Sequence, residues 1–175
     1  YGERLSSVID MSSNTTISSA VKAEMGFNGI NADALIEIPI IEDTLNIQGS
    51  LRRSYADVLQ TYTFNQFADK VFESTKINNS ENENNMFSFL DYTMKLNYKP
   101  NTSNSFYASV ISIDNELDYL VNDSQNNKAF NDKLVTSNMG YGLGWKVMWN
   151  ENTTQNTTAF FSDYKLNYNF ITKED

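Results

Sequence analysis

The sequence has 175 residues and a formal net charge of −9, with 13 Lys and Arg against 22 Asp and Glu. This acidic balance argues against a nucleic-acid-binding surface. The chain contains neither Cys nor His, which excludes disulfides, thiolate or imidazole metal ligands, and Cys-His or Ser-His nucleophiles. We therefore predict no catalytic residue, metal site or cofactor, and expect that the protein is not an enzyme.

In chain order, the first three predicted strands cover residues 16–27, 30–40 and 44–54. Apolar and polar residues alternate in each run, and a strand sends successive side chains to opposite faces, so each strand has one apolar and one polar face. Asn28-Gly29 between the first two runs is a strong hairpin signal. The Asn-rich connection after them contains Phe64, Phe67, Val71 and Phe72 at helical spacing, which predicts a short helix.

The fourth and fifth predicted strands, 86–99 and 105–120, flank the turn 100–104. The fourth run is longer than the roughly five to six residues of an average strand. It is typical of a membrane-spanning strand, for which roughly 9–11 residues suffice.

Hydrophobicity does not decide which face of the fifth strand points to lipid. Charge does, because a charged side chain in lipid is costly. Asp114, Glu116 and Asp118 share the parity of Phe106. We therefore predict that the odd-numbered residues face lipid: Tyr107, Ile111, Ile113, Leu117 and Tyr119.

A polar loop, 122–133, precedes the sixth and seventh predicted strands, 134–149 and 155–171. The apolar parity of the sixth strand includes Tyr141 and Leu143, and that of the seventh includes Phe160, Tyr164 and Leu166. The charge rule places six residues in a polar lumen: Lys22, Asp91, Lys95, Lys146, Asp163 and Lys165.

Connections alternate between short polar turns and longer loops, as in outer-membrane barrels. Tyr98, Tyr107, Trp149 and Phe160 flank the short turns, and Tyr119, Tyr141, Tyr168 and Phe170 lie toward the opposite ends. These residues predict two aromatic girdles at the membrane interfaces. The predicted fold is all-β, an antiparallel transmembrane β-barrel.

Two strings add a family resemblance. The first is YGERLSSVID at residues 1–10; the second combines Pro39 before a turn with Arg52, Arg53, Tyr55 and Asp57. Both resemble TonB-dependent outer-membrane receptors of the Bacteroidota type. Glu3 stands where these receptors often carry Gly, and Leu51 replaces a small residue.

The resemblance implies that residues 1–13 end a plug domain and that 14–175 begin a 22-stranded barrel. Seven strands cannot close a bacterial barrel, which has an even number, so we expect a fragment. The implied function is active import across the bacterial outer membrane. Its implied partners are outer-membrane lipid, the rest of the plug and barrel, the TonB complex and a surface lipoprotein. The alternatives are a passive porin or structural barrel and a soluble β-sandwich adhesin.

The candidate ligand-binding residues lie in the predicted lumen or at its rim: Arg52, Arg53, Asp91, Lys95, Asp114, Glu116 and Asp118. The two arginines could hold an anionic ligand or plug carboxylates, although a structural role at the rim is favoured. The three carboxylates of the fifth strand could bind Ca²⁺, but a solvated upper lumen wall is favoured.

Overall fold

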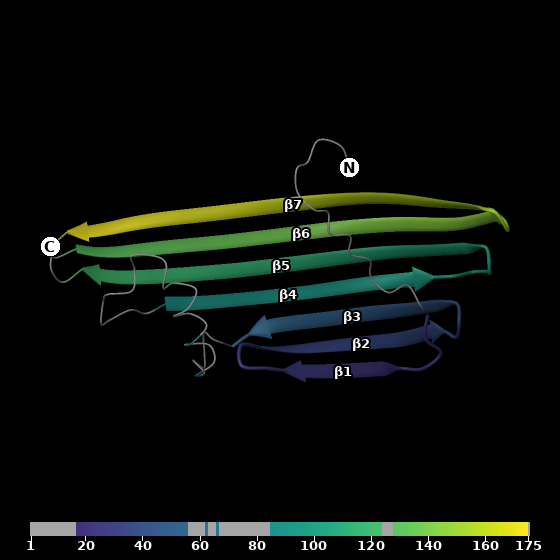
Figure 1. Cartoon of the computed structure of the whole chain (residues 1–175), viewed down its shortest axis with the longest axis horizontal. Coiled ribbons are helices and arrows are strands. Elements are labelled where there is room, and N and C mark those ends of the chain that lie inside the picture. Colours follow the sequence, from purple (N-terminus) through teal and green to yellow (C-terminus); the bar gives the residue numbers. More distant parts are fainter. Residues whose placement is uncertain (1–16, 56–61, 63–65, 67–84, 124–127, 175) are drawn as a thin grey trace.

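The chain folds into one antiparallel sheet of seven strands, arranged in sequence order (Figure 1). The computed structural model describes residues 17–55, 62, 66, 85–123 and 128–174. The all-β, antiparallel prediction is confirmed. Residues 1–13 and the helix predicted around Phe64 lie outside the described residues, so both remain predictions.

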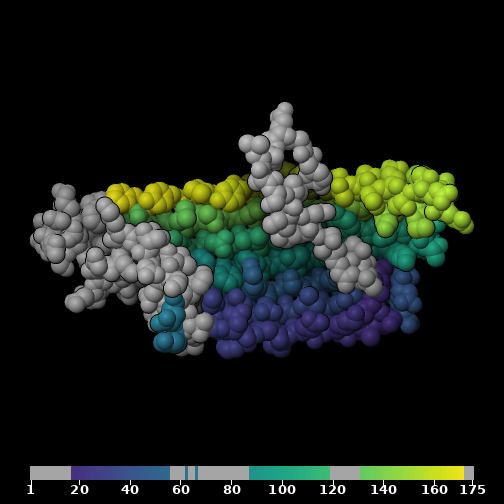
Figure 2. Space-filling model, in the orientation of Figure 1, coloured from purple at the N-terminus to yellow at the C-terminus, as the bar shows by residue number. Residues whose placement is uncertain are grey.

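The strands lengthen along the chain. Their bounds are β1 Lys22–Phe27, β2 Asn31–Ile41, β3 Leu45–Ser54, β4 Asn85–Tyr98, β5 Asn104–Asp123, β6 Lys128–Asn150 and β7 Thr153–Glu174. The turns β2–β3, β4–β5 and β6–β7 share one end of the sheet, which we call the short-turn end, on the right of Figure 1. At that end β6 and β7 project past β1–β3 (Figure 2).

Two boundaries differ from prediction. Residues 17–21 do not join β1; the Ser18 amide instead donates to the Glu37 carboxylate and the Ser18 hydroxyl to the Ala20 carbonyl, bonds that compete with a ladder. The loop predicted at 122–133 is mostly strand, because β5 and β6 remain paired as far as Asp123 and Lys128. The high Asn and Asp content of this stretch therefore predicted a longer loop than the structure contains.

No helix among the described residues is long and apolar enough to cross a membrane.

Strand pairing defines the two faces of the sheet, because directly paired residues lie side by side on the same face. We call them the Met94 face and the Lys95 face after two neighbours in β4. The Met94 face carries continuous cross-strand rows, of which one is Ala23, Ile36, Gly49, Met94, Val110, Tyr141 and Phe161. The next row of the Lys95 face is Lys22, Glu37, Gln48, Lys95, Ser109, Gly142 and Phe160.

Burial is inverted relative to a soluble protein in the half of the sheet near the short-turn end. On the Met94 face, Met94 and Leu143 are 58% and 60% exposed. On the Lys95 face, Glu37 and Lys95 are only 6% and 5% exposed. Among the residues that the structure describes, Val147 is the one buried hydrophobic side chain. No conventional apolar core holds this part of the sheet together.

The polarity of both faces changes along the longer strands. Beyond the level of Arg53 and Leu90, the Met94 face becomes charged or polar: Asp114, Glu116, Asp118, Lys133, Lys165 and Asn167. The Lys95 face becomes mainly apolar over the same levels: Phe87, Leu117, Leu134, Leu166 and Tyr168. We call this part of the sheet the far half. The two faces of the same strands therefore exchange polarity between the two halves.

The predicted orientation of β5 is wrong. Val110 pairs with Met94 and Asp114 pairs with Leu90, so the even-numbered residues lie on the Met94 face. Tyr107, on the other parity, lies on the Lys95 face. The charge rule failed because it treated the strand as lying in one environment, whereas its carboxylates belong to the far half.

The predicted orientation of β7 is also wrong. Phe160 pairs with Gly142 on the Lys95 face, whereas Asp163 and Lys165 lie on the Met94 face. A register shift between Met148 and Asn150 precedes the turn. A one-residue slip sends every later side chain to the opposite face, and the alternating pattern of β7 contains no sign of that bulge.

Glycines of β6 make room for an aromatic ring on the Lys95 face. Gly144 is paired with Tyr107, and a Cβ added to Gly144 would overlap the Tyr107 ring. The Lys95 ammonium lies 5.0 Å from the centroid of the same ring, within the range of a cation–π contact. The Tyr107 ring fills the space that the missing Gly144 side chain leaves.

We predict that Gly144→Ala destabilises the full-length protein by about 1–3 kcal/mol, because the new methyl group must displace the Tyr107 ring. Gly49→Ala is the matched control, since its Cβ would lie 3.5 Å from Ile36, an ordinary contact. Denaturant titration would measure both variants. In a Tyr107→Ala background the Gly144→Ala penalty should disappear; an unchanged penalty would refute the proposed contact.

Candidate functional site

The Lys95 face carries three of the predicted site residues, Arg52, Asp91 and Lys95. Arg52 and Asp91 are paired across β3 and β4 and form an ion pair. The guanidinium also lies 5.1 Å from the Phe89 ring centroid. Arginine combines a donor edge with an apolar, stackable face, so it binds Asp91 Oδ2 and packs on Phe89 at once.

The carboxylates around Arg52 are unequal. The Asp91 side chain is 16% exposed, and its Oδ1 has no hydrogen-bond partner among the described residues. Asp33 is paired with Arg52 from the other side, but its carboxylate lies over Gly26, where a Cβ would come within 2.5 Å of it. Arg52 therefore bonds to Asp91, one of the two acidic residues in its row.

Lys95 lies two rows nearer the short-turn end on the same face. It borders a pocket of about 350 Å³ on the Lys95 face, which is also lined by Lys22, Glu24, Glu37 and Thr93. The pocket mixes both signs of charge with hydroxyl groups, so it suits a polar ligand rather than an apolar one.

A buried polar ladder lies next to this pocket. Glu37 Oε1 accepts hydrogen bonds from the Ser18 amide at 3.1 Å and from Asn46 Nδ2 at 2.6 Å. Asn46 Oδ1 in turn accepts from Asn97 Nδ2 at 3.0 Å. The ladder ties residue 18 to β2, β3 and β4. Sequence alternation predicts the polar face of these residues, but not their bonds, because Asn46 and Asn97 lie 51 positions apart.

The remaining predicted site residues lie on the opposite face. Arg53, Asp114, Glu116 and Asp118 belong to the charged far half of the Met94 face. They do not join Arg52, Asp91 and Lys95 in one site.

A local ion pair involves one of these carboxylates. Glu116 accepts from Lys133 at 2.5 Å. This hydrogen bond, together with Coulombic attraction to Glu116 and Asp118, raises the pKa of Lys133. The lysine therefore remains charged through the physiological range. Ser112 likewise donates to Asp114 at 3.2 Å.

No group of three or more acidic side chains within the described ranges is arranged to hold a metal ion. The three carboxylates of β5 follow one another along the strand instead of converging on one point.

Comparison of the chain with protein-family models, with curated proteins and with solved structures found no match.

We predict that Glu37→Ala destabilises the protein by about 2–4 kcal/mol, because two buried donors lose their acceptor and each unsatisfied group costs about 1–3 kcal/mol. Glu37→Gln keeps one acceptor oxygen and should cost less. Glu24→Ala, an exposed position on the same face, is the control. Denaturant unfolding of the full-length protein measures the loss of stability in the three variants, which should be largest for Glu37→Ala and smallest for Glu24→Ala. Equal losses for Glu37→Ala and Glu24→Ala would exclude a stabilising ladder.

Proposed function

We propose that this sheet forms part of the wall of a transmembrane β-barrel in the bacterial outer membrane. The Met94 face of the short-turn half contacts lipid, and the Lys95 face lines the lumen. The observation that carries the proposal is the inverted burial. Met94 and Leu143 are exposed on one face of the sheet, whereas Glu37 and Lys95 are buried on the other. A barrel in lipid has this polarity, since apolar side chains lose nothing by facing hydrocarbon.

The dimensions of the apolar surface support this proposal. On β4 the Met94 face carries aromatic and apolar side chains from Tyr92 to Tyr98, which span about 20 Å at roughly 3.4 Å per residue. The apolar band of an outer-membrane barrel is about 25 Å tall. The strands β5 to β7 have 20, 23 and 22 residues, more than the roughly 9–11 that cross a membrane. The excess forms the far half, outside the lipid.

Aromatic side chains mark the edge of the apolar surface at the short-turn end. Tyr98, Phe106 and Trp145 form one row of the Met94 face, with neighbouring ring centroids 6.1 Å apart. Trp145 Nε1 donates to Asn104 Oδ1 at 3.1 Å. A ring against hydrocarbon with its N–H bonded toward the turn is the arrangement expected at a membrane interface. This row differs from the predicted girdle in using Phe106 and Trp145, with Tyr107 turned to the lumen.

The change of polarity in the far half supports the same orientation. Outside the membrane, the outer surface of a barrel wall meets water, which favours Asp114 and Glu116 there. Its inner surface then encloses loops or ligand, which favours Leu117 and Leu134. The strands β1 and β7 are open edges of the described sheet, so a closed barrel requires further strands of the same protein.

The proposed activity is TonB-dependent import of a ligand across the outer membrane, on the basis of the resemblance of residues 1–10 and of the string around Arg52 and Arg53. The wall itself has no enzymatic role. Arg52, Asp91 and Lys95 are the proposed lumen contacts for a ligand or the plug, while Arg53 and the β5 carboxylates form the outer rim. The partners are membrane lipid, the plug, the TonB complex and a surface lipoprotein.

We predict that Leu143→Lys impairs membrane assembly far more than Val135→Lys. Both residues lie on the Met94 face of β6, but only Leu143 lies within the proposed lipid band, where a lysine costs about 2–4 kcal/mol. The readout is the fraction of full-length protein recovered in outer membranes. Equal recovery of the two variants would refute the proposed membrane boundary.

A second prediction separates gated import from a passive pore. In planar lipid bilayers the full-length receptor should conduct little, because a plug fills the lumen. Removal of the plug should produce a large, steady conductance. A steady conductance of the intact protein would instead favour the porin alternative.

A further inference from the structure

A pocket at the short-turn end carries two lysines that form no ion pair with any residue the structure describes. The pocket has a volume of about 520 Å³ and is lined by Lys99 and Lys146 together with Thr102, Ser103, Asn104 and Ser105. Lys146 lies on the Lys95 face, paired with Ser105, and Lys99 follows Tyr98, the last residue of β4, at the turn between β4 and β5. We call it the two-lysine pocket.

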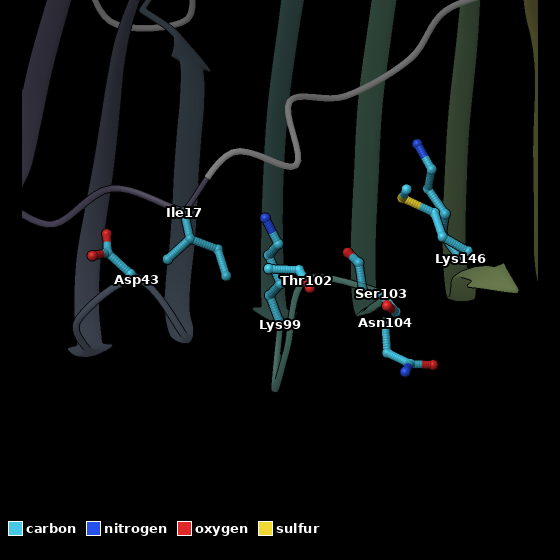
Figure 3. Close-up of a pocket in the computed structure, with 9 residues that line it drawn as sticks. Ile17, Asp43, Lys99, Thr102, Ser103, Asn104 and Lys146 are labelled. Atoms are coloured by element: carbon cyan, nitrogen blue, oxygen red, sulfur yellow. The ribbon is translucent and has the colours of Figure 1, made fainter. Parts of the chain in front are cut away.

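The two ammonium groups are directed to the same side of the pocket. In Figure 3 both lysine side chains point away from the turn tips, and Thr102 and Ser103 are drawn between them. Asp43 also lines the pocket, but Figure 3 draws it on the other side of Ile17 from the lysines. Thr102 and Ser103 therefore lie closer to the space between the lysines than this carboxylate does.

The floor of the pocket is fixed by backbone and side-chain hydrogen bonds. The Lys99 amide donates to the Thr44 carbonyl at 2.7 Å, and the Met148 amide to the Ser103 carbonyl at 2.8 Å. Asn101 Oδ1 accepts from the Ser103 and Asn104 amides at 3.0 and 2.8 Å. The backbone next to the two lysines is thus held by the β2–β3 turn, the β4–β5 turn and β6.

Three other cations of the described sheet have a carboxylate partner. Arg52, Lys133 and Lys165 each form an ion pair with a carboxylate. Within the described ranges, Lys99 and Lys146 make no such pair. In a chain with a net charge of −9, two lysines that share a pocket without a carboxylate partner repel each other unless an anion lies between them.

We propose that the two-lysine pocket binds an oxyanion group, a carboxylate or a phosphate, between the ammonium groups of Lys99 and Lys146. Each lysine donates a charge-assisted hydrogen bond to an anion oxygen, and the hydroxyls of Thr102, Ser103 and Ser105 offer further donors. The group is supplied either by a free anion or by a carboxylate of another segment of the same protein. This site does not depend on the proposed import function.

Lysine acetylation of the full-length protein, quantified residue by residue by mass spectrometry, tests the proposal with inorganic phosphate as the probe. Lys165, whose side chain is 70% exposed, reports the unprotected rate once Asp163→Asn has removed its ion pair. Slow labelling of Lys99 and Lys146 only in phosphate indicates a free oxyanion. Slow labelling in both conditions, relieved at Lys99 by Lys146→Gln, indicates a carboxylate of the protein.

Two lysine variants show whether the protection depends on the two-lysine pocket. Lys146→Gln should weaken protection of Lys99 about tenfold, because it removes one charge-assisted hydrogen bond. Lys22→Gln, on the same face but in a different pocket, should have no effect. Labelling at the Lys165 rate in both conditions would overturn the proposal, as would slow labelling that Lys146→Gln does not change. Membrane assembly of the same samples reports separately on the barrel.

Discussion

The pairing register between neighbouring strands is the constraint on which the rest of this structure depends. Only backbone ladders and side-chain contacts across them hold the seven strands together, because the described residues include a single buried hydrophobic side chain. A shift of one residue would exchange the faces of a whole strand. The polar contacts of the Lys95 face therefore matter more than their modest individual energies suggest, since several of them are possible in one register only.

Three contacts on that face illustrate this selectivity. The Tyr107 ring fits over Gly144 because no Cβ stands there, and Asn97 reaches Asn46 only when β3 and β4 pair as observed. Arg52 meets Asp91 in the same register. In a slipped register, Tyr107 would face away from Gly144, and buried amides would lose their partners at a cost of about 1–3 kcal/mol each. The face is thus specified by polar and steric matching rather than by an apolar core.

The sequence predicted much of the fold, and its errors have physical causes. The alternation of apolar and polar residues was sufficient to assign the faces of β2, β3, β4 and β6, because one parity of these strands is apolar throughout the short-turn half. It failed for β5, whose two parities are both partly apolar because the strand passes from one environment to another. It failed for β7 because a register shift next to Asn150 lies outside any alternating pattern. The ladder of Glu37, Asn46 and Asn97 was invisible, since its partners come from three different strands.

The β5 error is the most informative, because it shows what charges on a long strand mean. A carboxylate indicates a polar environment only at its own position along the strand. It does not determine which face of the entire strand is polar. Asp114 is paired with Leu90, at the level where Arg53 also appears on the Met94 face. On the opposite face, the adjoining row holds Arg52 and Asp91, after which Phe89 and Phe87 begin the apolar part of β4. Arg52 suits this junction, since its donor edge binds Asp91 while its flat surface packs on Phe89. The polarity of the two faces thus changes at neighbouring levels of the sheet. This is the arrangement expected if a single boundary between two environments crosses all the long strands.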